Sequence, residues 1–205
     1  MAFSVIIIRI LFIYNSMLVD DEAYYAIYAR HLSWGYIDHG PVVAFLIWIF
    51  TSIYENSFTV RFGAFLLMSI LPFILYFFIN RYFNNRSALI LSILVTVNLM
   101  LHMNSIIITP DVPLAFFTIL AILFYYIAYF EDQKYFYLGG AMLGIAVLSK
   151  VSALFPAIGI ALLPFVNKEM RHFLRNKHFY CSFIFAFVFV IPFIKWNLDN
   201  NLAFI

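Results

Sequence analysis

The chain has 205 residues, of which 65% are hydrophobic, 21% aromatic and only 11% charged. Soluble domains carry about 25% charged residues, and a soluble chain of this length cannot bury so much apolar surface. Apolar runs of about twenty residues recur along the sequence, which predicts an all-α integral membrane protein. The formal net charge is +2, and no basic surface, zinc-ligand spacing or Gly-rich phosphate loop points to nucleic acid, metal or nucleotide.

The first apolar run covers residues 3–18 and contains Arg9. A cleaved signal peptide would need positive charge before its apolar core and small residues at a cleavage site, and this run has neither. We therefore expect an uncleaved helix. Because the run is short for a span, some N-terminal residues are expected to be missing from it.

The densest group of charges follows this run, in a predicted outer loop over residues 19–54. Residues 22–34 predict a short amphipathic helix with Asp20 or Asp21 as its N-cap. Its apolar side is predicted to carry Tyr24, Ile27, Tyr28 and Leu32.

A turn is predicted over residues 34–40, followed by a second short helix over 41–53 that opens on Pro41. This helix is too short to span a membrane easily and is expected to lie at the interface. Further spans are predicted at 59–80, 87–108, 113–130, 136–149, 151–166 and 179–196, giving about seven transmembrane helices with the first run.

Two sequence details concern helix packing. Gly140 and Gly144 form a G-x-x-x-G pattern, which predicts close approach of two helices. The single cysteine, Cys181, lies in an apolar run and is interpreted as a packing residue.

The loop charges indicate how the chain is oriented. Cations concentrate in the loops at 81–86, 131–135 and 167–178, which the positive-inside rule assigns to the cytoplasm. Most acids fall on the opposite side, namely Asp20, Asp21, Glu22, Asp38, Glu55, Asp111 and Asp199. Carboxylates serve as general bases, cations hold phosphate, and aromatic rings stack on sugars or anchor at the interface. Composition alone leaves an ion pathway and a protein-binding surface open.

Four motifs carry a family resemblance. The first is a two-part pattern in the outer loop, where residues 21–25 read DEAYY and residues 32–41 read LSWGYIDHGP. Three later stretches follow in the same order as in the family: ITPDVP at 108–113, GIAVLSKVSA at 144–153 and PFIKWN at 192–197. Together they resemble family 39 glycosyltransferases, the bacterial relatives of protein O-mannosyltransferases and lipid A aminoarabinose transferases. Where the family pattern has His-Pro-Pro-Leu, this chain has His39-Gly40-Pro41-Val42.

The resemblance implies a GT-C membrane glycosyltransferase of the cell envelope. It implies sugar transfer from a polyprenyl-phosphate donor to a lipid, glycan or protein acceptor on the outer face of the inner membrane, with inversion and without a nucleotide or an obligatory metal. Family members are more than twice as long, so residues 1–205 are expected to form one transmembrane domain corresponding to the N-terminal half.

The resemblance also assigns site residues. Asp21 matches the catalytic base, although a carboxylate there also suits a simple N-cap, and Glu22 is its orienting neighbour. His39 matches a position that approaches the donor phosphate. The remaining substrate-binding candidates are Asp111, Lys150, Arg61, Tyr25 and Trp34. Four of these five have a structural alternative: a helix cap for Asp111 and Lys150, a snorkelling side chain for Arg61, and an interface anchor for Trp34.

Two other functions remain open. A non-catalytic fragment or a subunit of a split enzyme fits the chain length. A transporter would need ionisable groups near the membrane centre and an internal repeat, and apart from Arg9 the sequence shows neither.

Overall fold

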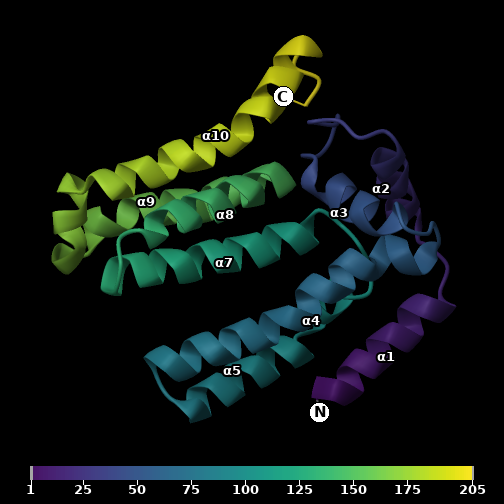
Figure 1. The fold of residues 1–205 in the computed structure, drawn as a ribbon, viewed down its shortest axis with the longest axis horizontal. Coiled ribbons are helices and arrows are strands. Elements are labelled where there is room, and N and C mark those ends of the chain that lie inside the picture. The colour runs from purple at the N-terminus through teal and green to yellow at the C-terminus, as the bar shows by residue number, and fades with distance from the viewer. Residues whose placement is uncertain (1, 205) are drawn as a thin grey trace. The chain divides into compact units, whose positions relative to one another are not determined.

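A computed structural model describes residues 2–204 of the chain, with side chains from residue 4 onward. The described residues are helical and contain no strand. They divide into two compact units, drawn in Figure 1. Unit 1 comprises the chain up to Leu32 together with Val43–Pro113, and unit 2 comprises Ser33–Val42 together with the chain from Leu114 onward.

Unit 1 holds the N-terminal helices and the beginning of α7. In chain order these are α1 (Ala2–Asn15), α2 (Asp20–Arg30), α3 (Val42–Thr51), α4 (Ser57–Tyr82), α5 (Asn85–Val97), α6 (Leu99–Met103) and α7 (Asp111–Phe130). Helices α4 and α5 lie side by side, and α1 packs on α4 through Ile13 and Phe65. Ile106, in the segment between α6 and α7, completes this small core.

Unit 2 is built around an aromatic core. Besides most of α7, its helices are α8 (Tyr135–Ser149), η1 (Val151–Ala153), α9 (Leu154–Val166), η2 (Lys168–Arg175) and α10 (Lys177–Asp199). Tyr125, Phe136, Phe173 and Phe179 are almost completely buried together. Because these rings come from α7, α8, η2 and α10, they pack these four helices together at one end of the unit.

Helices α8 and α10 pack against each other in unit 2. A Cβ atom on Gly140 would lie 2.1 Å from the carbonyl oxygen of Ser182, and one on Gly144 would lie 2.7 Å from that of Ala186. Both separations are too short for a side chain, so only glycine allows the two backbones to approach this closely. The predicted G-x-x-x-G contact is confirmed.

The structure shows fewer membrane-crossing helices than the predicted seven. Three described helices, α4, α7 and α10, are long and apolar enough to span a bilayer. Residues 151–166, which form η1 and α9, are followed by η2 at a bend of 106°. If these two parts count as one element, they give a fourth candidate span. The protein is therefore an all-helical membrane protein with three or four candidate spans, and seven spans are not shown.

The break at Asn98 illustrates why an apolar run does not have to form one long helix. The run 87–108 was predicted to form one helix, but the backbone of Asn98 leaves the helical conformation at φ −60° and ψ 122°. Its side chain then accepts a hydrogen bond from the N–H of Leu101 and caps α6. Apolar residues thus continue past a point where the helix ends, and α5 has only 13 residues.

Arg9 is buried inside α1, within the predicted apolar run. Its Nε donates to Nδ1 of His102 at 3.3 Å, and its Nη2 donates to the carbonyl of Thr96 at 3.4 Å. The arginine therefore joins α1 to α5 and α6. His102 serves here as the acceptor that satisfies a buried donor.

The two short helices of the predicted outer loop are present, with two corrections. The N-cap of α2 is Val19, so Asp20 and Asp21 both lie in the first turn instead of capping it. The buried residues of α2 are Glu22, Tyr25 and Ala29. The predicted apolar side is wrong, since Tyr24 and Ile27 are 42% and 53% exposed. Glu22 determines which face of α2 is buried, because it pairs with Arg61 inside unit 1.

Candidate functional site

The start of α2 is fixed by a buried ion pair between Glu22 and Arg61 of α4. The two side chains are 0% and 1% exposed. Nε of Arg61 donates to Oε1 of Glu22 at 2.8 Å and to Oε2 at 3.0 Å, and Nη2 also donates to Oε2. A planar guanidinium and a carboxylate matched in this way form a strong, directional contact.

Every donor of the Arg61 guanidinium is used. Nη1 donates to the carbonyl of Ser16 at 2.9 Å and to its hydroxyl at 2.6 Å, and Nη2 donates to the carbonyl of Met17 at 2.6 Å. With the bonds to Glu22, these contacts account for all five N–H groups of an arginine. Arg61 therefore joins α4 to the end of α1 and to α2.

Glu22 in turn connects two of the sequence motifs. Its Oε2 accepts the N–H of Val19 at 3.0 Å, which satisfies the backbone at the start of α2. Its Oε1 accepts the N–H of Ile108 at 3.0 Å. The DEAYY motif and the ITPDVP motif, separated by more than eighty residues, are thus hydrogen-bonded to each other within unit 1.

Asp21 is exposed although it precedes the buried Glu22. Among the described residues, its carboxylate forms no hydrogen bond or ion pair. It lies in the first turn of α2, where free backbone N–H groups and the helix dipole favour a negative charge. This position presents an exposed carboxylate, unpaired among the described residues, on a helix that the Glu22–Arg61 pair holds in place.

Three tyrosines share the Asp21 side of α2. Tyr24, Tyr25 and Tyr28 follow Asp21 at three, four and seven residues, which is the spacing of one helix face. The rings of Tyr24 and Tyr28 lie 4.7 Å apart between centroids, and their hydroxyls are hydrogen-bonded to each other. Tyr25 is 7% exposed and packs edge-on against both. The face combines one carboxylate with aromatic surface.

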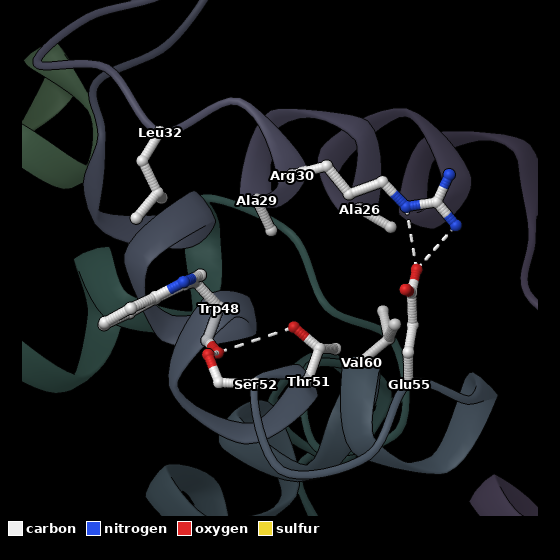
Figure 2. Close-up of a pocket in the computed structure, with 9 residues that line it drawn as sticks. All are labelled: Ala26, Ala29, Arg30, Leu32, Trp48, Thr51, Ser52, Glu55 and Val60. Atoms are coloured by element: carbon white, nitrogen blue, oxygen red, sulfur yellow. Dashed lines mark hydrogen bonds and ion pairs between the residues drawn. The ribbon is translucent and has the colours of Figure 1, made fainter.

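The opposite side of α2 carries a separate pocket, drawn in Figure 2. Asp21 and Arg30 are nine residues apart, or about two and a half helical turns, so they point in opposite directions. Arg30 forms an exposed ion pair with Glu55, with Nε donating to Oε1 at 2.8 Å. The pair, the Trp48 ring and the chain around Thr51 line a pocket of about 380 Å³.

In unit 2, the turn 33–42 packs against α8 and α10. A Cβ atom on Gly35 would lie 2.4 Å from the Trp196 ring, and one on Gly40 would lie 1.8 Å from the carbonyl oxygen of Leu148. Neither position has room for a side chain. The WGYIDHGP, LSK and PFIKWN motifs therefore meet within one unit.

The turn is also held by its own hydrogen bonds. The N–H of Tyr36 donates to the carbonyl of His39 at 3.1 Å, and the N–H of Ser33 donates to the Tyr36 hydroxyl at 3.1 Å. Burial raises the pKa of Tyr36, and the bond from Ser33 partly opposes that shift. Nε2 of His39 lies 3.9 Å from Oδ2 of Asp38.

Lys150 and Asp111 lie at helix ends, as predicted. Lys150 is the C-cap of α8, and its backbone N–H donates to the carbonyl of Ala146. It lies two residues after Leu148, whose carbonyl oxygen packs against Gly40. Asp111 is the first residue of α7 and is half-buried. Trp34 is 52% exposed at the start of the turn in unit 2. Among the described residues, no group of three or more His, Cys, Asp and Glu side chains is placed to hold a metal ion.

A family model described as dolichyl-phosphate-mannose-protein mannosyltransferase matches residues 38–196. The chain belongs to this family. The match covers more than half of the sequence and confirms the resemblance seen in its motifs. It includes His39, Arg61, Asp111 and Lys150, whereas Asp21 precedes it. Neither the curated proteins nor the solved structures contain a match to the chain. Membership indicates a membrane glycosyltransferase.

Sequence reasoning missed the residues that hold the motifs in place. Ser16 and Met17 were not singled out, although their oxygens accept three of the Arg61 donors. Gly35 lies in the predicted turn, and nothing in the sequence indicates its close contact with the Trp196 ring. An arginine near the start of an apolar helix indicates a nearby acceptor, but this signal does not identify Glu22 as the partner.

Proposed function

We propose that this protein transfers a sugar from a polyprenyl-phosphate donor to a hydroxyl group of an acceptor at the outer face of the membrane, with Asp21 as the general base. Family membership supports the glycosyltransferase activity. The exposed, unpaired carboxylate of Asp21 beside the buried Glu22–Arg61 pair is the observation that supports the base assignment.

The proposed reaction balances without a further reactant. The acceptor oxygen attacks the anomeric carbon and forms the new glycosidic bond. The bond between that carbon and the phosphate oxygen breaks, and polyprenyl phosphate leaves with the electron pair. The acceptor proton passes to the Asp21 carboxylate as the new bond forms, which is general-base catalysis. Attack opposite to the leaving group inverts the anomeric configuration.

Asp21 suits proton transfer better than Glu22 does. A base must reach the substrate, and the Asp21 carboxylate is exposed and has no protein partner among the described residues. Glu22 is completely buried and already accepts from Arg61, Val19 and Ile108. We therefore assign Glu22 a positioning role, in which it holds the first turn of α2 and so the backbone of Asp21.

The geometry changes the proposed role of Arg61 in the same way. The sequence suggested that its guanidinium contacts the donor phosphate. All five of its donors are engaged inside unit 1, so phosphate contact would require breaking buried bonds. We assign Arg61 to positioning, together with Glu22.

The donor phosphate is assigned to residues of unit 2. His39 and Lys150 supply a hydrogen-bond donor and a cation, the groups that a phosphate needs. Both flank the contact between Gly40 and the carbonyl of Leu148. Trp34, which is 52% exposed, offers aromatic surface for a sugar ring, whereas the buried Tyr25 is assigned to supporting the rings of Tyr24 and Tyr28. Asp111 is assigned to the acceptor. These assignments are proposals that rest on the motifs.

The test is turnover by the purified chain reconstituted in vesicles. A polyprenyl-phosphate sugar labelled in the sugar would be supplied with lipid, glycan and peptide acceptors, and labelled product would be measured. We expect product from the wild-type chain and a roughly 10²- to 10⁴-fold lower rate from Asp21→Asn, which is the usual contribution of a general base.

Asp20→Asn is the matched control, because Asp20 is an exposed aspartate in the same helical turn. Its rate should stay close to that of the wild type. Full activity of Asp21→Asn would reject Asp21 as the base. No turnover by the wild-type chain with any acceptor would reject activity of this chain alone, and would favour a subunit of a split enzyme.

A further inference from the structure

The loop between α9 and α10 is an ordered, strongly basic segment, residues 167–177. Helix η2 forms most of it, and η2 bends away from the preceding helix by 106°. Asn167 caps it by accepting the N–H of Glu169 at 2.9 Å, and it ends where the N–H of Asn176 donates to the carbonyl of Phe173 at 2.9 Å. The segment thus has a defined conformation and direction.

A 3-10 helix has three residues per turn, so residues three apart form a row along it. One row contains Met170 and Phe173, and Phe173 is 3% exposed in the aromatic core, with its ring 4.8 Å from that of Tyr129. The other two rows hold Lys168 and Arg171, and Glu169, His172 and Arg175. The buried row fixes which rows face outward.

The cations of these outward rows are exposed and unpaired. Lys168, Arg171, Arg175 and the adjoining Lys177 are all exposed. None forms an ion pair within the part of the chain that the structure describes. The single acid of the segment, Glu169, is exposed as well and leaves a clear excess of positive charge. Unpaired cations held on a rigid face favour an anionic partner.

The helices on both sides indicate what that partner is. Phe165 and Val166, at the end of α9, are 58% and 79% exposed, and Tyr180 and Ile184 of α10 are 50% and 61% exposed. In a membrane protein such surfaces contact lipid tails. The basic segment begins where this apolar surface stops, which is the depth of the phospholipid headgroups.

We propose that the basic segment binds the headgroups of anionic phospholipids, with Lys168, Arg171 and Arg175 as the main contacts. The bend before η2 turns the segment away from the direction of α9, and the buried Phe173 prevents it from rotating. The bound lipids would therefore hold the α9–η2–α10 hairpin at a fixed depth in the bilayer. This inference does not depend on the proposed transfer reaction.

The test uses the full chain reconstituted in phosphatidylcholine vesicles that contain spin-labelled phosphatidylglycerol or spin-labelled phosphatidylcholine. Electron paramagnetic resonance measures the fraction of each label that is immobilised at the protein. We expect a several-fold preference for phosphatidylglycerol, because each cation near an anionic surface strengthens binding by up to about five-fold. Added salt should reduce this preference by screening the charges. The triple variant K168Q/R171Q/R175Q should lose most of the preference.

Two further variants make the result decisive. R81Q/R86Q/K134Q removes three cations at the ends of other helices, namely Arg81 of α4, Arg86 of α5 and Lys134 before α8, and should keep most of the preference. K168R/R171K/R175K keeps the charge and should keep the preference too. Equal losses in the two neutralised triples, no preference in the wild type, or a loss in the charge-keeping variant would each overturn the proposal.

Discussion

Glu22 and Arg61 form a buried ion pair across 39 positions of sequence, and this pair determines which acidic residue of the first loop is exposed. Because Glu22 turns inward to Arg61, the preceding Asp21 lies on another face of α2 and is exposed. Two adjacent carboxylates thus acquire different environments. Glu22 is buried in unit 1, whereas Asp21 is exposed on α2.

We predict that breaking this pair strongly destabilises the protein. Arg61→Met leaves the Glu22 carboxylate buried without its cation, and removing one partner of a buried pair costs about 3–5 kcal/mol. The double variant Glu22→Leu/Arg61→Met should be more stable than Arg61→Met alone, since no unpaired charge remains. Denaturant unfolding in detergent measures the free energy of unfolding of both variants and of Glu22→Leu. A loss in the double variant equal to the sum of the two single losses would contradict the coupling.

The exposed pair between Arg30 and Glu55 should behave differently. Its side chains are 64% and 53% exposed, and Figure 2 shows them at the rim of the pocket behind α2. Exposed pairs usually contribute about 0–1 kcal/mol, and salt screens them. We expect Arg30→Gln to lower the free energy of unfolding by less than about 1 kcal/mol. The difference should disappear in high salt, whereas a large, salt-independent loss would show that the pair is more than a surface contact.

Much of the fold could be predicted from apolar periodicity. Helices occur in each of the predicted runs, and Lys150 ends α8 as expected. The number of spans could not be predicted, because hydropathy locates apolar residues and does not locate the points where the backbone leaves the helix. Asn98 is such a point, since its side chain replaces a lost backbone partner and starts a new helix.

The site could be predicted only in part, for a similar reason. The motifs led us to propose Asp21 and Glu22 as site residues, but their separate environments depend on Arg61, which lies far away in sequence. Local preference also predicted an aspartate as the N-cap of α2. In the structure Val19 is the N-cap, and its backbone N–H donates to the carboxylate of Glu22. The departure at Gly40 was visible in the sequence, but its cause, the contact with Leu148, was not.

That contact gives a further prediction. Gly40→Ala places a methyl group where only 1.8 Å separates it from the carbonyl oxygen of Leu148, so the backbone must move. We expect a loss of about 1–3 kcal/mol, the usual cost of overpacking. Gly159→Ala is the control, because a Cβ atom there meets nothing within 4 Å and alanine favours the helix. Thermal unfolding compares the two, and equal midpoints would contradict the close approach.

The last prediction concerns the donor. If His39 and Lys150 bind the donor phosphate equally in the ground state and the transition state, removing either should raise the KM for the donor and leave kcat nearly unchanged. A hydrogen bond to a charged group contributes about 1.5–3 kcal/mol, so His39→Ala or Lys150→Met should raise that KM roughly 10- to 150-fold.

His39→Gln and Lys150→Arg, which keep a donor, should recover part of the affinity, and Lys134→Met, in the exposed α7–α8 loop, should leave the KM unchanged. Steady-state rates at varied donor concentration separate the two constants. If kcat fell while the KM for the donor stayed constant, the residues would act on the transition state instead, and their assignment to donor binding would be wrong.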